Sequence, residues 1–160
     1  NSQSKTQETN LIYYQIKKEL EEKKKQGQSV NIQEYNIDSN SDFDTEEFVR
    51  DIFVNGGTLP DVLVCMDEVV TECVYQALVD YNEVGNVDVV GFYYSDVILD
   101  AISKGIISSA IALDMKEIGT YSVNALVEYS SLGHTSSYYS VGQHVINKNN
   151  VCTYRTGEGY

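Results

Sequence analysis

The 160-residue chain has one proline, no tryptophan and no apolar run approaching the roughly 18 residues that a membrane span needs. No secretory leader opens it, and it begins at Asn1 in polar sequence without a methionine. We therefore interpret it as a piece of a larger protein, in which a leader or anchor upstream would leave no trace. A hydrophobic content of 42% and only 11 glycines exclude a disordered or fibrous chain, and the length predicts one core.

Metal-binding and disulfide patterns are missing. The three cysteines include no Cys-x-x-Cys pair, and the only histidines, His134 and His144, stand ten residues apart. Cys65 lies in an apolar run and Cys73 on the following predicted helix, so both are interpreted as small core residues, whereas Cys152 lies in a polar tail. We expect no disulfide framework, no metal site and no cofactor.

Positive charge is scarce outside the first 26 residues. That segment holds six of the eleven basic residues and four glutamates, a net charge of +2. Because the net charge of the whole chain is −13, the remaining residues carry −15. An acidic fold repels nucleic acid and anionic lipid. We expect no nucleic-acid partner. The simplest explanation of the acidic net charge is that it keeps the protein soluble.

Apolar runs of strand length alternate with segments of helical periodicity. This order predicts an α/β fold, a Rossmann-like and mostly parallel sheet with helices on both faces. The expected organisation is a polar segment over 1–9, one lobe over 10–150 and a tail over 151–160. Helices are predicted over 10–26, 45–55, 68–82, 96–105 and 115–130, and strands over 30–37, 61–66, 87–92, 107–113 and 137–146.

The buried core is predicted from the apolar runs. Runs such as 61–66 and 87–92 are continuous rather than alternating, which is typical of parallel strands covered on both faces. The core is therefore expected to contain Val62, Val64, Val89, Gly91, Ile107 and Ile111.

Motifs of enzymes are weak or absent. The Asn55–Thr58 stretch NGGT follows a helix and precedes a strand, the reverse of a phosphate loop, and no Gly-x-Ser-x-Gly elbow occurs. The neighbouring carboxylates Asp67 and Glu68 stand at a strand end, but they diverge, and Glu68 is better explained as favouring a helix N-terminus. His144 lies in an alternating segment and is interpreted as a surface or strand-packing residue. We expect this domain not to be an enzyme and assign no catalytic residue.

Residues 59–133 resemble the C-terminal lobe of type 1 periplasmic sugar-binding proteins and the effector domains of lactose-repressor-like regulators. In that family three strands end in an Asn-Asp-Glu-like turn, in Gly-Phe-Asp and in an Ala-Gln-like pair, followed by Ile-Gly in the next helix. The corresponding positions here are Met66-Asp67-Glu68, Gly91-Phe92-Tyr93, Ala112-Leu113 and Ile118-Gly119. The ordered set, with the predicted elements before it, extends the resemblance over about residues 10–150. The lobe's first strand is not recognisable in residues 1–9.

The resemblance implies that the sugar-contacting polar residues have been replaced. The family's Asn, Asp and Gln at these strand ends hydrogen-bond sugar hydroxyls, and Met66, Tyr93 and Leu113 stand in their places. Each unmet buried hydroxyl costs on the order of 1–3 kcal/mol, so we expect an inactive sugar pocket. The same edge is expected to serve as a protein interface through Asp67, Tyr93, Tyr94 and Asp114, with the exposed side of helix 68–82 as the competing surface.

The resemblance and the departures together suggest an extracytoplasmic sensor domain, for example of a two-component sensor histidine kinase. Such a domain would dock a separate sugar-binding protein, or pair with a second copy, and membrane spans would flank it outside this piece. The alternative is a fragment of a sugar-binding protein or sugar-responsive regulator that binds a small ligand directly.

Overall fold

The structure is a computed structural model that describes residues 2–37 and 41–155. The chain divides into two units, residues 1–38 and residues 39–160, and each is considered by itself. Among the described residues, no helix combines the length and the apolar character needed to cross a membrane.

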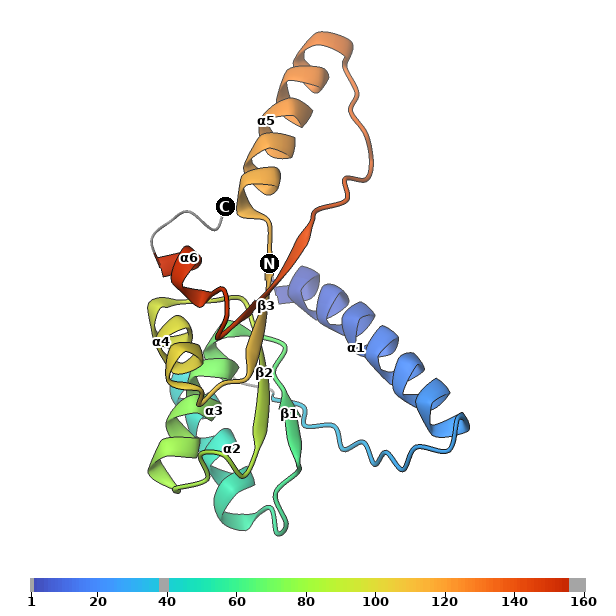
Figure 1. The fold of residues 1–160 in the computed structure, drawn as a ribbon. Helices are drawn as coiled ribbons and strands as arrows, with labels where there is room; N and C mark the ends of the chain where they lie inside the picture. The colour runs from blue at the N-terminus through green and yellow to red at the C-terminus, as the bar shows by residue number, and fades with distance from the viewer. Residues whose placement is uncertain (1, 38–40, 156–160) are drawn as a thin grey trace. The chain divides into compact units, whose positions relative to one another are not determined.

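The first unit contains one helix and an extended segment. Helix α1 spans Ser2–Lys25 (Figure 1), so the predicted helix is confirmed but begins well before residue 10. Three lysines, at 23–25, occupy its last turn, where positive charge stabilises the negative end of the helix dipole. The strand predicted over 30–37 is wrong, because this segment is not paired with any strand. Alternation alone does not make a strand, since the backbone needs a neighbour for its hydrogen bonds.

The second unit follows the predicted alternation of helices and strands (Figure 1). The final helix was not predicted; the other elements of this unit lie within a few residues of expectation, except that the last strand starts later. The elements are α2 (Asp42–Asn55), β1 (Val62–Val64), α3 (Glu68–Asp80), β2 (Asp88–Phe92), α4 (Asp96–Lys104), β3 (Ser109–Leu113), α5 (Met115–Leu132), β4 (Gln143–Asn147) and α6 (Val151–Arg155).

The four strands form one sheet in the order β1-β2-β3-β4. β1, β2 and β3 are parallel, and β4 returns antiparallel to β3 with Ala110 opposite Ile146 and Ala112 opposite His144. The parallel strands are joined by α3 and α4, as the crossover geometry of parallel pairs requires. The predicted α/β class with a mostly parallel sheet is confirmed.

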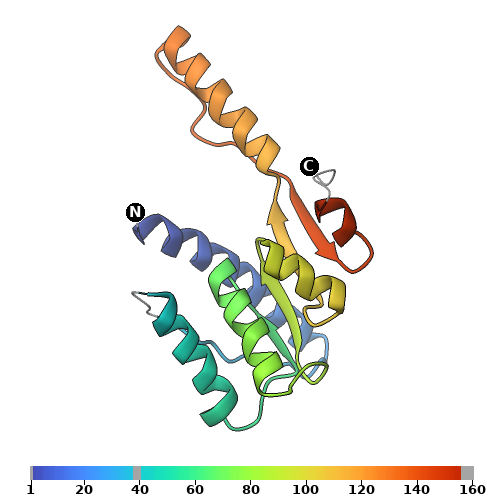
Figure 2. The same cartoon turned by 90° about the vertical axis from the view of Figure 1, so that its left-hand side faces the viewer.

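One face of the sheet packs against helices and contains the core. Figure 2 shows α2, α3 and α4 side by side over this face, and α3 and α4 contact the strands. Val89 is fully buried here, and Gly91 lies under Thr71 of α3. A Cβ at Gly91 would lie 2.5 Å from the Thr71 Cγ2 atom, so this contact requires glycine.

On the opposite face of the sheet, part of the predicted core is exposed to solvent. Val62 and Val64 are 51% and 46% exposed, and Ile111 is half-buried, whereas Val89, Gly91 and Ile107 are buried as expected. β1 is an edge strand of this sheet, and the helices of residues 41–155 that contact strands pack on the other face. A continuous apolar run does not distinguish a strand covered on both faces from one covered on a single face.

Candidate docking surface at the carboxyl edge of the sheet

The three positions expected to have lost sugar contacts lie at one edge of the sheet. β1, β2 and β3 run parallel, so the residues that follow their carboxyl ends meet at the same edge. Met66 follows β1, Tyr93 follows β2 and Leu113 ends β3, and all three are half-buried. The ladder holds Tyr93 in place, because Tyr93 donates its backbone N–H to the carbonyl of Ile111 at 2.8 Å.

Tyr93 has an unusual backbone conformation. Its φ is +62°, in the left-handed region that glycine adopts readily and that costs other residues free energy. Its ring meets the ring of Phe92 edge-on, with centroids 4.8 Å apart. The backbone at Tyr93 therefore carries a conformational cost that glycine would avoid.

Both carboxylates predicted for this edge are used to begin helices. Asp67 caps α3 by accepting the backbone N–H of Val69 at 2.9 Å, and Asp114 caps α5 by accepting that of Glu117 at 2.9 Å. The Glu117 N–H, followed by the His144 ring, holds the pKa of the Asp114 carboxyl below its usual value. Glu68 is the first residue of α3, where a negative charge is favourable. These contacts account for the Asp67–Glu68 pair without acid–base chemistry.

Two residues beside the edge, Tyr154 and His144, were not predicted from the sequence to belong to this region. Tyr154 of α6 meets Tyr94 edge-on at 5.8 Å and lies 6.5 Å from the ring of His144. His144 in turn lies 3.3 Å from Asp114, so an aromatic cluster adjoins the capped carboxylate. No helix was predicted in the polar tail, but Val151 is buried and Arg155 pairs with Asp100 of α4 at 2.7 Å. The apolar and aromatic pair at 151 and 154, three residues apart, was the signal for this short helix.

The side chains at the strand ends of this edge are mainly apolar and aromatic. Methionine, tyrosine and leucine stand at the strand ends, and the two carboxylates are occupied by backbone N–H groups. Across residues 2–37 and 41–155, no three His, Cys, Asp or Glu side chains gather as a metal site. Burial raises the pKa of the Cys65 thiol to about 12, so this thiol is unreactive near neutral pH.

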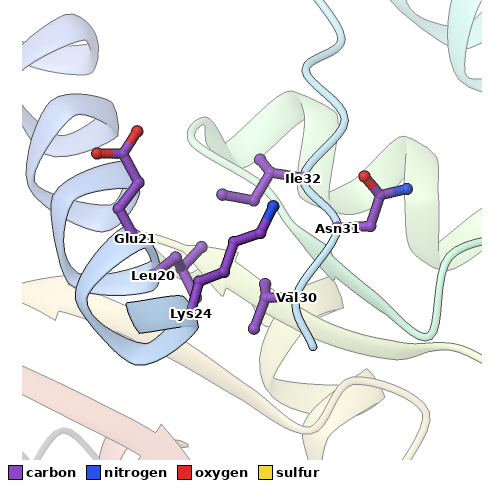
Figure 3. A pocket seen from close by; sticks show the side chains of 6 residues that line it. All are labelled: Leu20, Glu21, Lys24, Val30, Asn31 and Ile32. Carbon is purple, nitrogen blue, oxygen red and sulfur yellow. The ribbon is translucent and has the colours of Figure 1, made fainter. Parts of the chain in front are cut away.

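Two surface hollows of the described residues lie away from the strand ends. One, of about 180 Å³, lies between α1 and the segment after it, with Leu20 and Lys24 opposite Val30 and Ile32 (Figure 3). The other, of about 270 Å³, lies on α5 and is lined by Ile118, Tyr121, Ser122, Ala125, Tyr139 and Val141. Three of the six residues that line the first hollow are polar, Glu21, Lys24 and Asn31, whereas the second hollow is lined mainly by apolar and aromatic groups.

The fold matches one lobe of type 1 periplasmic sugar-binding proteins. An ABC transporter solute-binding protein from Agrobacterium vitis, bound with α-D-tagatopyranose, is 20% identical, with a TM-score of 0.65 over 77% of this chain and 40% of its own. A mutant XylFII–LytSN complex is 25% identical, with a TM-score of 0.57 over 73% of this chain and 42% of its own. The XylFII molecule is 26% identical, with a TM-score of 0.56 over 66% and 37%.

The chain spans about 40% of the length of the solved structures that it matches. No protein-family model and no curated protein matches the sequence. The fold is therefore established by structure: a single α/β lobe similar to one lobe of periplasmic solute-binding proteins.

Proposed function

We propose that this lobe is an extracytoplasmic interaction domain that docks a sugar-binding protein and does not bind free sugar itself. The observation that carries the proposal is the carboxyl edge of the sheet, where Met66, Tyr93 and Leu113 stand at the ends of three parallel strands. A buried sugar hydroxyl facing such side chains would lose its hydrogen bonds, at about 1–3 kcal/mol each. An apolar and aromatic centre edged with carboxylates is instead the composition of a protein interface.

The sensor context is supported by the kind of structure that this lobe resembles. One neighbour is a complex named for two components, XylFII and LytSN, so a lobe of this fold occurs in an assembly. By analogy we place the chain outside the cytoplasmic membrane, as the sensing part of a two-component histidine kinase. The output region and the membrane spans then belong to the protein beyond these residues.

Two binding measurements test the proposal. Calorimetry against common pentoses and hexoses is expected to show no heat of binding, and sedimentation with the sugar-binding protein encoded beside this chain's gene is expected to show a complex. A micromolar dissociation constant for any free sugar would contradict the first half. Absence of a complex with that protein, with and without its sugar, would contradict the second half.

A second candidate is a ligand-binding protein in which this lobe is one of two. The observation in its favour is the part of each chain that is matched. The XylFII molecule alone matches over nearly the same shares of the two chains as the complex does, which points to similarity with that component. Two lobes that close on a ligand would supply polar contacts from the other side. A homologous lobe encoded next to this one in the same gene, together with sugar binding by the pair, would favour this candidate.

A further inference from the structure

The loop that follows β2 has a backbone that is held from both sides. Phe92 donates its backbone N–H to the Thr71 hydroxyl of α3 at 3.3 Å, and the Tyr93 N–H bonds β3 on the other side. Ser95, which caps α4, donates its hydroxyl to the Glu72 carboxylate of α3. Because this backbone is fixed, the surface that the carboxyl edge presents depends on where the two tyrosine rings of the loop point.

Each tyrosine ring of this loop lies against a different aromatic partner. The Tyr93 ring meets Phe92, its neighbour in the chain. The Tyr94 ring meets Tyr154 of α6 edge-on, with ring centroids 5.8 Å apart, and the His144 ring lies 6.5 Å from that of Tyr154. An edge-on pair favours one relative orientation of its two rings over others. The orientation of the Tyr94 ring therefore depends on a residue of a separate element.

The contacts of α6 give Tyr154 a fixed base. Val151 is buried, and the Arg155 guanidinium donates to the Asp100 carboxylate of α4 at 2.7 Å. The side chain of Asn150, just before the helix, bonds the backbone of β4 at 2.8 and 2.9 Å. Helix α6 lies beside α4 in both views (Figures 1 and 2). A helix of five residues has little stability of its own, so these contacts hold it in place.

We propose that Tyr154 is a positioning residue of the docking surface, which holds the Tyr94 ring in the orientation that contacts the sugar-binding protein. This inference rests on the proposed function and adds to it a residue from a separate element. A side chain that is already fixed in the free protein loses less freedom when the partner docks. Fixing one side chain in advance corresponds to a gain of about three- to tenfold in affinity.

Two other roles for Tyr154 predict different behaviour. A residue that only stabilises α6 would contribute to the melting temperature without acting through Tyr94. A residue that contacts the partner itself would contribute to binding whether or not Tyr94 is present. A positioning residue contributes to binding only while the ring that it positions is there, so the effects of the two tyrosines are not additive.

A double-mutant cycle on the full chain separates these roles, with the intact sugar-binding protein encoded beside its gene as the probe. We expect Tyr154→Ala to weaken binding by about three- to tenfold in the wild-type background and by less than about twofold in the Tyr94→Ala background. Tyr154→Phe keeps the ring and is expected to bind within about twofold of wild type. Tyr138→Ala removes a tyrosine that is 77% exposed on another segment, and this control should leave binding unchanged.

Circular dichroism and thermal melting verify that every variant folds. If Tyr154→Ala does not fold, Tyr154→Leu takes its place in the cycle, because leucine retains apolar volume without the ring.

Each outcome decides a different point. Equal weakening by Tyr154→Ala in both backgrounds, or no weakening in the wild-type background, overturns the positioning role and leaves the proposed function standing. Weakening by Tyr154→Phe as large as that by Tyr154→Ala assigns the effect to the hydroxyl group and overturns the role of the ring. Failure of the wild type to bind contradicts the proposed function, and this inference with it.

Discussion

Asp114 faces His144 where residues 115–142, which include α5, leave and rejoin the sheet. The Asp114 carboxylate Oδ2 lies 3.3 Å from the His144 Nε2 atom, while its Oδ1 accepts the backbone N–H of Glu117. Asp114 joins β3 to α5, and His144 lies on β4, where the chain returns to the sheet. The same carboxylate therefore begins the helix and links it to the returning strand.

This contact predicts a pH dependence of stability. The pKa of Asp114 is lowered in the folded state, so its contribution is present above the unfolded pKa, about 3.9, and is lost as the pH falls through the folded value. Asp114→Asn keeps a good helix cap and removes the charge. We expect the variant to melt below wild type at pH 7 and the difference to shrink below about pH 4.

Melting curves between pH 7 and pH 3 check this prediction. Asp61→Asn removes the same charge at an exposed position away from the Asp114–His144 contact and serves as the control. A constant difference between wild type and Asp114→Asn across the whole range would contradict the assigned role of the carboxylate.

Val89 tests which face of the sheet is the core. Its side chain is fully buried, and a lone carboxylate there costs several kcal/mol against a total stability of about 5–15 kcal/mol. We expect Val89→Asp to be unfolded by circular dichroism. Val62→Asp makes the same change at a position that is 51% exposed and is expected to fold. Cooperative melting of Val89→Asp would show that β2 is not central.

The close contact between Gly91 and Thr71 predicts that a side chain at position 91 clashes with Thr71, and that shortening Thr71 relieves the clash. Gly91→Ala would place its Cβ 2.5 Å from Thr71 Cγ2, and such overpacking costs about 1–3 kcal/mol. Thr71→Ser removes that methyl group and keeps the hydroxyl, which donates to the Asp67 carbonyl at 2.7 Å. We expect the double variant to be more stable than the sum of the two single changes. Urea denaturation in a double-mutant cycle measures this coupling, and strict additivity would argue against the clash.

The sequence predicts the helix-covered face of the sheet better than it predicts the remaining surfaces. Runs such as 87–92 and their intervening helices follow from local apolar spacing, which explains the correct fold class. The exposure of Val62 and the missing strand at 30–37 depend on neighbours distant in sequence, which spacing does not report. For α5, the amphipathic pattern identifies an apolar side but not what covers it. Tyr154 joins the edge only because α6 packs on α4, a tertiary contact of a short helix.

The backbone of Tyr93 predicts a difference between two substitutions. With φ at +62°, glycine relieves a conformational cost of about 1–2 kcal/mol that alanine retains, whereas both remove the ring. Glycine also loses more entropy on folding, by about 0.5–1 kcal/mol. We expect Tyr93→Gly to be more stable than Tyr93→Ala by up to about 1 kcal/mol, measured by urea denaturation. Equal stability would indicate that this backbone is not strained.

The last prediction separates the edge of the sheet from the competing helix as a contact surface. Tyr93→Ala with Tyr94→Ala removes two aromatic side chains from the edge, and aromatic anchors dominate interfaces, so we expect docking of the sugar-binding protein to weaken by about 2 kcal/mol or more. Tyr138→Ala removes a tyrosine that is 77% exposed and lies on neither surface, so it is the control and should leave docking unchanged. Val79→Glu places a charge on the exposed side of α3, the competing surface. If sedimentation shows that Val79→Glu abolishes the complex while a well-folded Tyr93/Tyr94 variant retains it, the contact belongs to α3 and not to the strand ends.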